Sequence, residues 1–292
     1  MKNIFLFLFI LSFVFLGGCN KIDSFSPTQT TSLYDSYRVK AIKKTDRNSL
    51  YTYDSKGRIL TWEEASSGYE AIFSYYSNYI MIERTGYAGL QNTYRLDLNS
   101  NGYGIKETFY DFDKKTILDF RTYEYDANGN LSKERNNKSV IEKEYTWQNN
   151  NNIKMIRKYS TPYDPFFGQS DYYDEFTIEF DAKQLETRNF GVGHWGKNLA
   201  FGGIYSNEIP NNVYGAYVPT KIVIKSTTTI LKNGVKKTSK ISSTYTYTNE
   251  IDKNGLITKC SYKVVNVNVG PNGDTDTNSG SGSETYEYTK IK

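Results

Sequence analysis

The chain has 292 residues and a formal net charge of +4 at neutral pH. Its apolar share is 38%, its aromatic share is 16%, and 27 residues are tyrosines, a composition that favours strands. Basic and acidic residues alternate along the expected strands, as in Lys133, Glu134 and Arg135, so no basic stripe indicates nucleic-acid binding.

The first segment is typical of an exported protein. Residues 4–16 are almost wholly apolar and follow a single lysine, and a run of this length is too short to cross about 30 Å of hydrocarbon as a helix. It therefore predicts a secretory signal peptide. Gly17, Gly18 and Cys19 come directly after it and resemble a bacterial lipobox. The alternative is an ordinary signal peptide followed by a chance cysteine.

The lipobox resemblance implies an address for the protein. Residues 1–18 would be removed as a lipoprotein signal peptide and Cys19 would be lipidated, and two or more acyl chains anchor a protein stably. Asn20 follows, whereas in the enterobacterial sorting rule an Asp there favours the inner membrane. The resemblance thus implies anchoring to the outer membrane, on its periplasmic face or at the cell surface. Residues 19–33 comprise the lipidated cysteine and a flexible tether.

Residues 34–292 are expected to form a single all-β domain. Strand-like runs alternate with Gly or Asn turns from residue 34 to residue 159, which is typical of an antiparallel meander. Asp126 and Gly129 match the first and fourth positions of a type I turn in which the glycine takes a positive φ. The corresponding hairpin loop pairs Tyr125 with Leu131, Tyr53 with Ile59, Ile251 with Ile257, and Leu98 with Gly104.

Two of these corners resemble a known pattern. The segments YTYDSKGRIL at residues 51–60 and YEYDANGNLSKE at residues 123–134 resemble YD repeats, the Tyr-Asp hairpin units of bacterial surface and secreted β-rich proteins. Together with the first nineteen residues, the chain resembles the YD-like β-meander lipoproteins of Gram-negative bacteria. In large YD proteins the repeats build structural shells and carry no catalytic residues.

The second half of the chain departs from this rhythm. Residues 161–171 interrupt it with two prolines, and residues 187–220 lose all period. A segment this long without regular structure is often functional, and we expect it to cover one end of the sheet. Longer strands are expected at residues 221–231, 235–247, 256–269 and 284–292. Residues 270–283 read as a flexible loop.

Contact residues are sought among the aromatic side chains outside the strand rhythm. Tyrosine and tryptophan offer a flat apolar face and a polar group to a sugar ring. The candidates for ligand binding are His194, Trp195, Phe201, Tyr205, Tyr214 and Tyr217. A structural or surface role is the alternative for the histidine, because one histidine makes no His-rich metal site.

A weak calcium candidate lies in the expected loop. Asp274, Asp276 and Asn278 supply oxygen atoms at alternate positions, but Gly280 comes one place late and Glu284 one place early for a calcium loop. A solvated loop is therefore favoured, and neither a metal nor another cofactor is expected.

The expected fold is a long antiparallel meander that forms an open half-barrel or strongly twisted sheet. The expected function is that of a lipid-anchored cell-envelope protein with a non-catalytic binding or scaffold role for a glycan or a protein partner. The alternative is a carrier of a lipid or other apolar ligand on the concave side of the half-barrel. An enzyme is not expected, because no catalytic constellation is visible.

Overall fold

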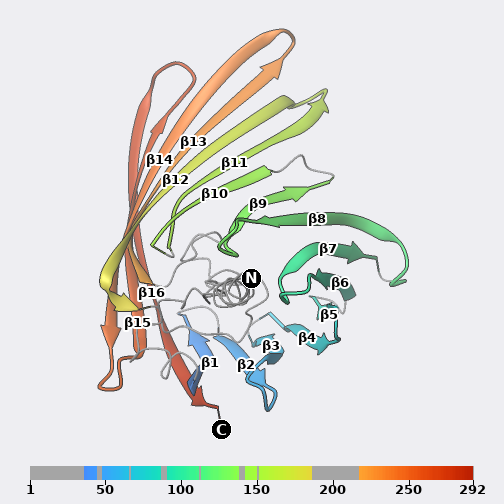
Figure 1. Ribbon diagram of the computed structural model, residues 1–292. Coiled ribbons are helices and arrows are strands. Elements are labelled where there is room, and N and C mark those ends of the chain that lie inside the picture. Colours follow the sequence, from blue (N-terminus) through green and yellow to red (C-terminus); the bar gives the residue numbers. More distant parts are fainter. Residues whose placement is uncertain are drawn as a thin grey trace, which may run out of the picture.

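The computed structural model describes residues 36–44, 48–65, 67–86, 91–111, 113–137, 142–149, 151–185 and 217–291. These residues form sixteen strands that pair antiparallel in chain order and close into a barrel (Figure 1). The expected all-β meander is confirmed. Within the described ranges, no helix is long and apolar enough to cross a membrane.

The strands fall into two length classes. The first ten have six to nine residues each: β1 (Tyr37–Lys43), β2 (Asn48–Tyr53), β3 (Ile59–Glu64), β4 (Tyr69–Tyr75), β5 (Tyr79–Thr85), β6 (Gln91–Leu98), β7 (Gly104–Tyr110), β8 (Ile117–Tyr125), β9 (Leu131–Asn136) and β10 (Glu142–Gln148). The last six are longer: β11 (Asn151–Asp164), β12 (Gly168–Leu185), β13 (Tyr217–Lys232), β14 (Val235–Ile251), β15 (Ile257–Val269) and β16 (Thr275–Lys290).

Closure of the sheet corrects the expected open half-barrel. The first strand pairs with the last, and Val39 lies opposite Tyr288 while Ile42 lies opposite Tyr286. This pairing removes the two unpaired edges that an open sheet would leave. It also joins apolar side chains of both terminal strands in one core, which stabilises the closed form.

The corner at Asp126 folds as its residues predict. Its carboxylate accepts hydrogen bonds from the backbone N–H groups of Asn128 and Asn130, both at 2.9 Å. Gly129 has a φ of +79°, a conformation in which a side chain is strained. The four expected cross-strand pairs are all present: Tyr125 with Leu131, Tyr53 with Ile59, Ile251 with Ile257, and Leu98 with Gly104.

At four corners an aromatic side chain donates a hydrogen bond to the residue that begins the return strand. Tyr125 Oη donates to the Gly104 carbonyl at 2.6 Å, and this glycine lies two residues after the turn glycine Gly102. The same arrangement recurs at three further corners: Tyr75 with Ile59 at 2.9 Å, Trp147 Nε1 with Leu131 at 2.7 Å, and Tyr288 with Ile257 at 2.7 Å. Each bond joins two adjacent strands beside the ladder of backbone bonds.

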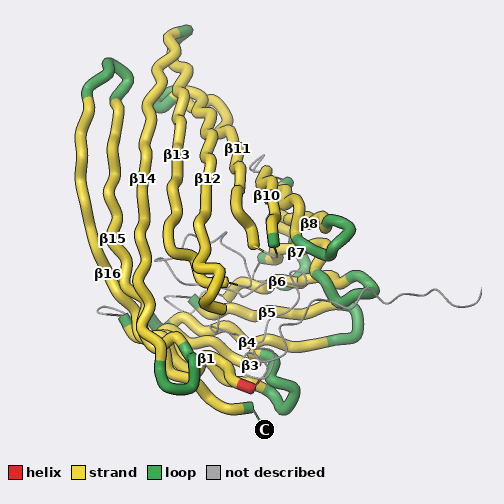
Figure 2. Tube along the Cα trace, turned by 60° about the vertical axis from the view of Figure 1, so that its left-hand side comes forward, coloured by secondary structure: helices red, strands yellow, loops and turns green. Residues whose placement is uncertain are grey.

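The long strands extend past the ring formed by the short ones, as the tall strands β11–β16 in Figure 2 show. Two expectations for this region are wrong. Residues 161–171 interrupt the sheet only for a turn between β11 and β12, and β16 begins at Thr275, inside the expected loop 270–283. Residues 217–220 of the expected irregular segment belong to β13, and the rest of that segment, from residue 187 to 216, lies outside the described residues.

One face of the strands turns to the interior of the barrel. Successive side chains of a strand point to opposite faces, and the buried apolar residues form one cluster drawn from strands all around the ring. In a closed barrel that face must be the inner one. The cluster includes Val39, Tyr51, Trp62, Phe73, Ile80, Leu96, Tyr123, Tyr145, Met155, Phe176, Ile222, Tyr247, Cys260 and Tyr286.

Candidate functional site

The outward face of the barrel carries cross-strand ion pairs. Lys154 and Glu175 directly precede the core residues Met155 and Phe176, so they point away from the interior. Their Nζ and Oε1 atoms are 3.0 Å apart. Further outward pairs are Lys221 with Glu179 at 2.8 Å, Lys259 with Glu250 at 2.7 Å, Lys133 with Glu142 at 2.5 Å, and Lys43 with Glu287.

This outward face differs from that of a barrel embedded in lipid. Such a barrel presents an apolar band about 25 Å tall, and a lysine or arginine on that band costs about 2–4 kcal/mol at the bilayer midplane. Here the ion pairs occur on strands from both ends of the sheet. The outward face therefore carries paired charges where an embedded barrel carries its apolar band, although exposed apolar residues such as Leu50 and Ile72 lie on this face as well.

The inward face is apolar and aromatic. Beside the buried cluster, it carries half-buried side chains that pack against that cluster: Tyr53, Tyr75, Ile82, Leu98, Tyr125, Trp147, Phe180, Ile224, Tyr245, Tyr262 and Tyr288. Burial raises the pKa of Tyr53, Tyr75 and Tyr125, so these hydroxyls stay protonated and remain hydrogen-bond donors. The interior thus offers flat apolar surfaces edged by neutral polar groups.

A row of charged side chains crosses this inner face. Glu134 on β9 lies opposite Lys143 on β10, Lys143 lies opposite Arg157 on β11, and Arg157 lies opposite Asp174 on β12. Lys143 Nζ is 2.9 Å from Glu134 Oε1, and Arg157 Nη2 is 2.6 Å from Asp174 Oδ2. Tyr145 donates to Glu134 at 3.2 Å. The row is built from neighbouring strands in register, so the sheet itself fixes its geometry.

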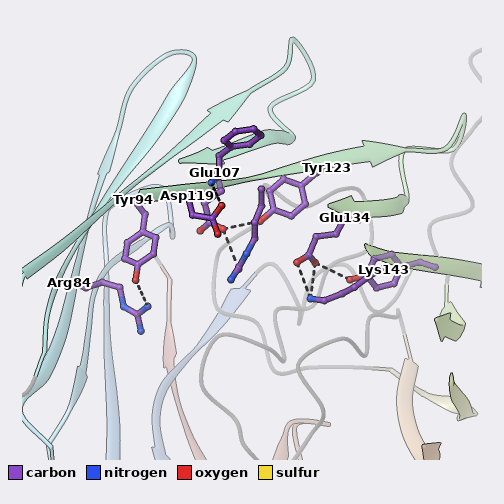
Figure 3. A network of polar contacts seen from close by, with 10 residues as sticks. Arg84, Tyr94, Glu107, Asp119, Tyr123, Glu134 and Lys143 are labelled. Carbon is purple, nitrogen blue, oxygen red and sulfur yellow. Dashed lines mark hydrogen bonds and ion pairs between the residues drawn. The ribbon is translucent and has the colours of Figure 1, made fainter. Parts of the chain in front are cut away.

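A second polar group continues the row on β7 and β8. Tyr123 Oη donates to Glu107 Oε2 at 2.9 Å, and Arg121 lies 3.5 Å from the same carboxylate. Figure 3 shows Glu107, Tyr123, Glu134 and Lys143 gathered on one side of the sheet. Burial raises the pKa of Glu107 in spite of the nearby arginine, and burial likewise lowers the pKa of Lys143 against the pull of Glu134.

The comparisons with known proteins bear on the fold. No family model and no curated protein matches the chain. The chain is similar to the crystal structure of a porin-like protein from Bacteroides uniformis, with 14% identity and a TM-score of 0.50 over 87% of this chain and 96% of that chain. At this identity the similarity concerns the fold alone. The TcdB2-TccC3-TEV structure matches with 11% identity over 80% of this chain and 16% of that chain, and its TM-score of 0.23 is too low to indicate a shared fold.

The comparisons leave the sequence resemblances as predictions. No family model links the chain to YD repeats, so that resemblance stays a prediction. Cys19, the signal peptide and the tether lie outside the described residues. The anchor is thus tested neither by the structure nor by the matched protein.

Of the six aromatic and histidine candidates, Tyr217 alone lies in the described part of the chain. It begins β13 opposite Leu185, is half-buried, and its backbone N–H donates to Asn151 Oδ1 at 3.1 Å. His194, Trp195, Phe201, Tyr205 and Tyr214 lie outside the described residues. Whether the six gather at one site therefore stays a prediction.

The weak calcium candidate lies in and beside a regular strand. Asp276 and Asn278 are exposed on β16, and Asn278 Oδ1 accepts a hydrogen bond from Asn266 Nδ2 at 2.7 Å. In a strand, alternate side chains are about 6.5–7 Å apart along the chain, whereas a calcium loop curls its ligands around one ion. Among the described residues, no group of three or more His, Cys, Asp or Glu side chains could hold a metal ion.

Sequence reasoning missed the inner charged row. Glu134 and Lys143 occur in runs of alternating charge that read as a solvated strand face. Alternation from the nearest core residue identifies Lys143, which lies two positions before Tyr145, but it places Glu134, which lies three positions after Leu131, on the wrong face. A shift by a bulge or turn at the strand start decides which charges face inward, and that shift is visible only in the paired strands.

Proposed function

We propose that the protein is a non-enzymatic binding protein of the bacterial cell envelope that carries an apolar or amphipathic molecule inside its barrel. The observation that carries this proposal is the division of the two faces. Several ion pairs lie on the outward face, while the buried cluster of aromatic and aliphatic side chains lies on the inward face. A barrel built in this way keeps its exterior in water and offers its interior to an apolar partner.

The width of the barrel supports an interior ligand. Barrels of eight strands are filled by their own side chains or hold one small ligand, and the enclosed space grows with strand number. Sixteen strands therefore suit a larger or elongated molecule. The charged row contributes three acidic and three basic groups, Glu107, Glu134, Asp174, Arg121, Lys143 and Arg157, so it favours a neutral or zwitterionic head group over a net anion or cation.

The envelope location rests on the predicted leader and on Cys19, and the porin-like fold of the Bacteroides uniformis protein is in keeping with it. Lipid anchoring to the outer membrane is part of the proposal. A glycan or protein partner at residues 187–220 is the other prediction. Either role is that of a binding protein, and we propose no catalysis.

The experiment compares two neighbouring residues of β13. Ile224 packs against the inner cluster, whereas Val223 points outward, and both are half-buried. A fluorescent lysophosphatidylcholine, which has a zwitterionic head group, is titrated into the parent, Ile224→Gln and Val223→Gln. Loss of the inward contact should weaken binding about tenfold, since burying such a side chain contributes roughly 1.5–3 kcal/mol when complete. No binding to the parent, or equal binding by the two variants, would exclude an interior carrier site.

A further inference from the structure

The most exposed aromatic side chains lie at the turn between β11 and β12. Among the large apolar residues exposed in the described part of the chain, Phe166 and Phe167 have the highest exposed fractions, 78% and 76%, and Tyr163 beside them is 56% exposed. This turn is at the end of the long strands that extend past the ring (Figure 2). Burial in the folded chain therefore does not explain these rings.

The turn between β13 and β14 reaches the same level and touches this one. Gln169 pairs with Leu231, and Lys232 Nζ donates to the Phe166 carbonyl at 2.6 Å. Leu231 and Val235 are exposed there as well. We call Tyr163, Phe166, Phe167, Leu231, Lys232 and Val235 the distal tip.

The charge around the distal tip is positive. Between residues 221 and 249 the β13–β14 hairpin holds six lysines and no carboxylate, and the exposed lysines nearest the tip are Lys232, Lys236, Lys237 and Lys240. Asp164 in the turn contributes one negative charge, which offsets one of these lysines, and its carboxylate accepts from the N–H groups of Phe166 at 2.7 Å and Phe167 at 2.9 Å.

Nearby carboxylates do not cancel this charge at the apex. Asp171 lies opposite Thr229, three positions before Lys232, and accepts from Ser160 Oγ at 2.7 Å. Asp274 and Asp276 belong to the β15–β16 hairpin, and that hairpin turns back where Val269 pairs with Lys240. The β13–β14 strands continue beyond this level to the pair Lys232 with Val235. The aromatic rings and the three lysines closest to them therefore project furthest.

We propose that the distal tip docks onto an anionic phospholipid bilayer. Aromatic rings favour the interface between water and lipid, and each lysine near an anionic surface adds about 1 kcal/mol of attraction. A stable protein partner needs about 800 Å² on each side. The three exposed aromatic rings supply on the order of 400 Å², since a whole ring buries 150–250 Å². The tip is thus small for a protein interface and well suited to lipid.

This contact is separate from the predicted anchor. Tyr37, at the start of β1, pairs with Lys290, at the end of β16. The distal tip lies near the other end of β16, where that strand begins at Thr275. The chain thus enters the barrel at the end opposite to the distal tip, and the tip contact does not depend on Cys19 or on a ligand in the interior.

The experiment places a reporter at the tip. In the full chain carrying Cys19→Ala, Phe166→Trp is mixed with vesicles of phosphatidylcholine alone or with added phosphatidylglycerol, each containing brominated acyl chains. The matched control is Ile117→Trp, which replaces a residue that is 55% exposed at the start of β8. Phe166 is so exposed that its replacement leaves the fold intact. Attachment through the N-terminal segment alone gives no signal at residue 166.

We expect several-fold stronger quenching at residue 166 in phosphatidylglycerol vesicles than in phosphatidylcholine, and no extra quenching at residue 117. Replacing Lys232, Lys236 and Lys237 with glutamine should weaken this binding by roughly fivefold per lysine. Absence of quenching at residue 166 in both vesicles, or equal quenching in both, would overturn the proposal. So would a concentration-dependent dimer that Phe166→Ser abolishes, because the tip would then bind a second copy.

Discussion

Single residues decide the corners of this barrel, and their chemistry is local enough to be predicted. The carboxylates of Asp54 and Asp252 illustrate this. Burial alone would raise the pKa of each, but hydrogen bonds from the backbone N–H groups of the turn, aided at Asp54 by the Arg58 side chain, hold each pKa below its usual value. The groups involved lie within four residues, so the sequence contains the whole interaction.

Glycine is required at position 104 because of a contact with another strand, and the sequence around it does not reveal that contact. A Cβ at this position would lie 2.6 Å from Leu96 Cδ1 and 3.1 Å from its Cγ. Gly104→Ala should therefore lower the free energy of unfolding by about 1–3 kcal/mol through overpacking. Leu96→Val in the same chain should restore part of that loss. Chemical denaturation of the two single variants and the double variant checks this, and purely additive effects would contradict the contact.

Glu107 gives a pH dependence with a definite sign. Burial raises its pKa in the folded state above the unfolded value, so its contribution to stability is full below the unfolded pKa and is lost as pH rises through the folded pKa. Glu107→Gln removes this loss. The free energy of unfolding of the variant, minus that of the parent, should therefore increase between about pH 4 and pH 8. Loss of the Arg121 contact shifts this difference by a constant and does not change its slope.

The control is Glu142→Gln on the outward face. A hydrogen bond from Lys133 lowers the pKa of Glu142, so this carboxylate contributes stability above its unfolded pKa that is lost as pH falls through the folded pKa. The relative stability of Glu142→Gln should therefore fall as pH rises. The two variants should show opposite slopes in urea denaturation, and equal slopes would contradict the inward placement of Glu107.

At the scale of elements, the strand pattern and the cross-strand pairs follow from turn chemistry and alternation. The hydrogen-bonding role of the recurring tyrosines does not follow from these local patterns. In strands the tyrosines read as packing residues, yet Tyr125 also donates to a carbonyl on the preceding strand. Donor and acceptor are joined only by the register of the sheet, so a sequence pattern alone does not reveal the bond.

Tyr125→Phe tests this aromatic fastening. The variant keeps the ring but leaves the Gly104 carbonyl without the hydroxyl donor, which should cost about 0.5–1.5 kcal/mol of stability. Tyr76→Phe is the control, because Tyr76 is 51% exposed and its stacking on Tyr79, with centroids 4.3 Å apart, needs only the ring. Thermal denaturation should separate the two variants. Equal midpoints would show that the hydroxyl bond adds no stability.

For the molecule as a whole, composition and spacing predicted an all-β meander but not its closure. The residues that close the barrel stand at opposite ends of the chain, and no local motif marks a pairing of β1 with β16. The same holds for the charged row inside the barrel, where inward and outward charges share one alternating pattern. Long-range pairing and face assignment were therefore the parts that required the structure.

A pair of cysteines tests the closure directly. Lys43 lies opposite Thr285 and both are exposed, and cross-strand neighbours are close enough for a disulfide. With Cys19→Ala, the variant Lys43→Cys/Thr285→Cys should cross-link on oxidation and migrate faster on a non-reducing gel. The control Lys43→Cys/Ser281→Cys places the second cysteine on the same face of β16 but four residues out of register, and it should not cross-link. If the first pair does not cross-link, the sheet is open and the closed barrel is wrong.

The chain-order pairing of the strands gives the barrel one seam. Fifteen of its sixteen strand contacts join consecutive strands, and the remaining one joins β1 to β16. Most consecutive strands are joined by short loops, although residues 186–216 separate β12 from β13. The seam must close a loop that contains nearly the whole described chain, at a larger entropic cost. The hairpins therefore form early and the seam last, so the folding chain exposes two unpaired strand edges until β1 meets β16.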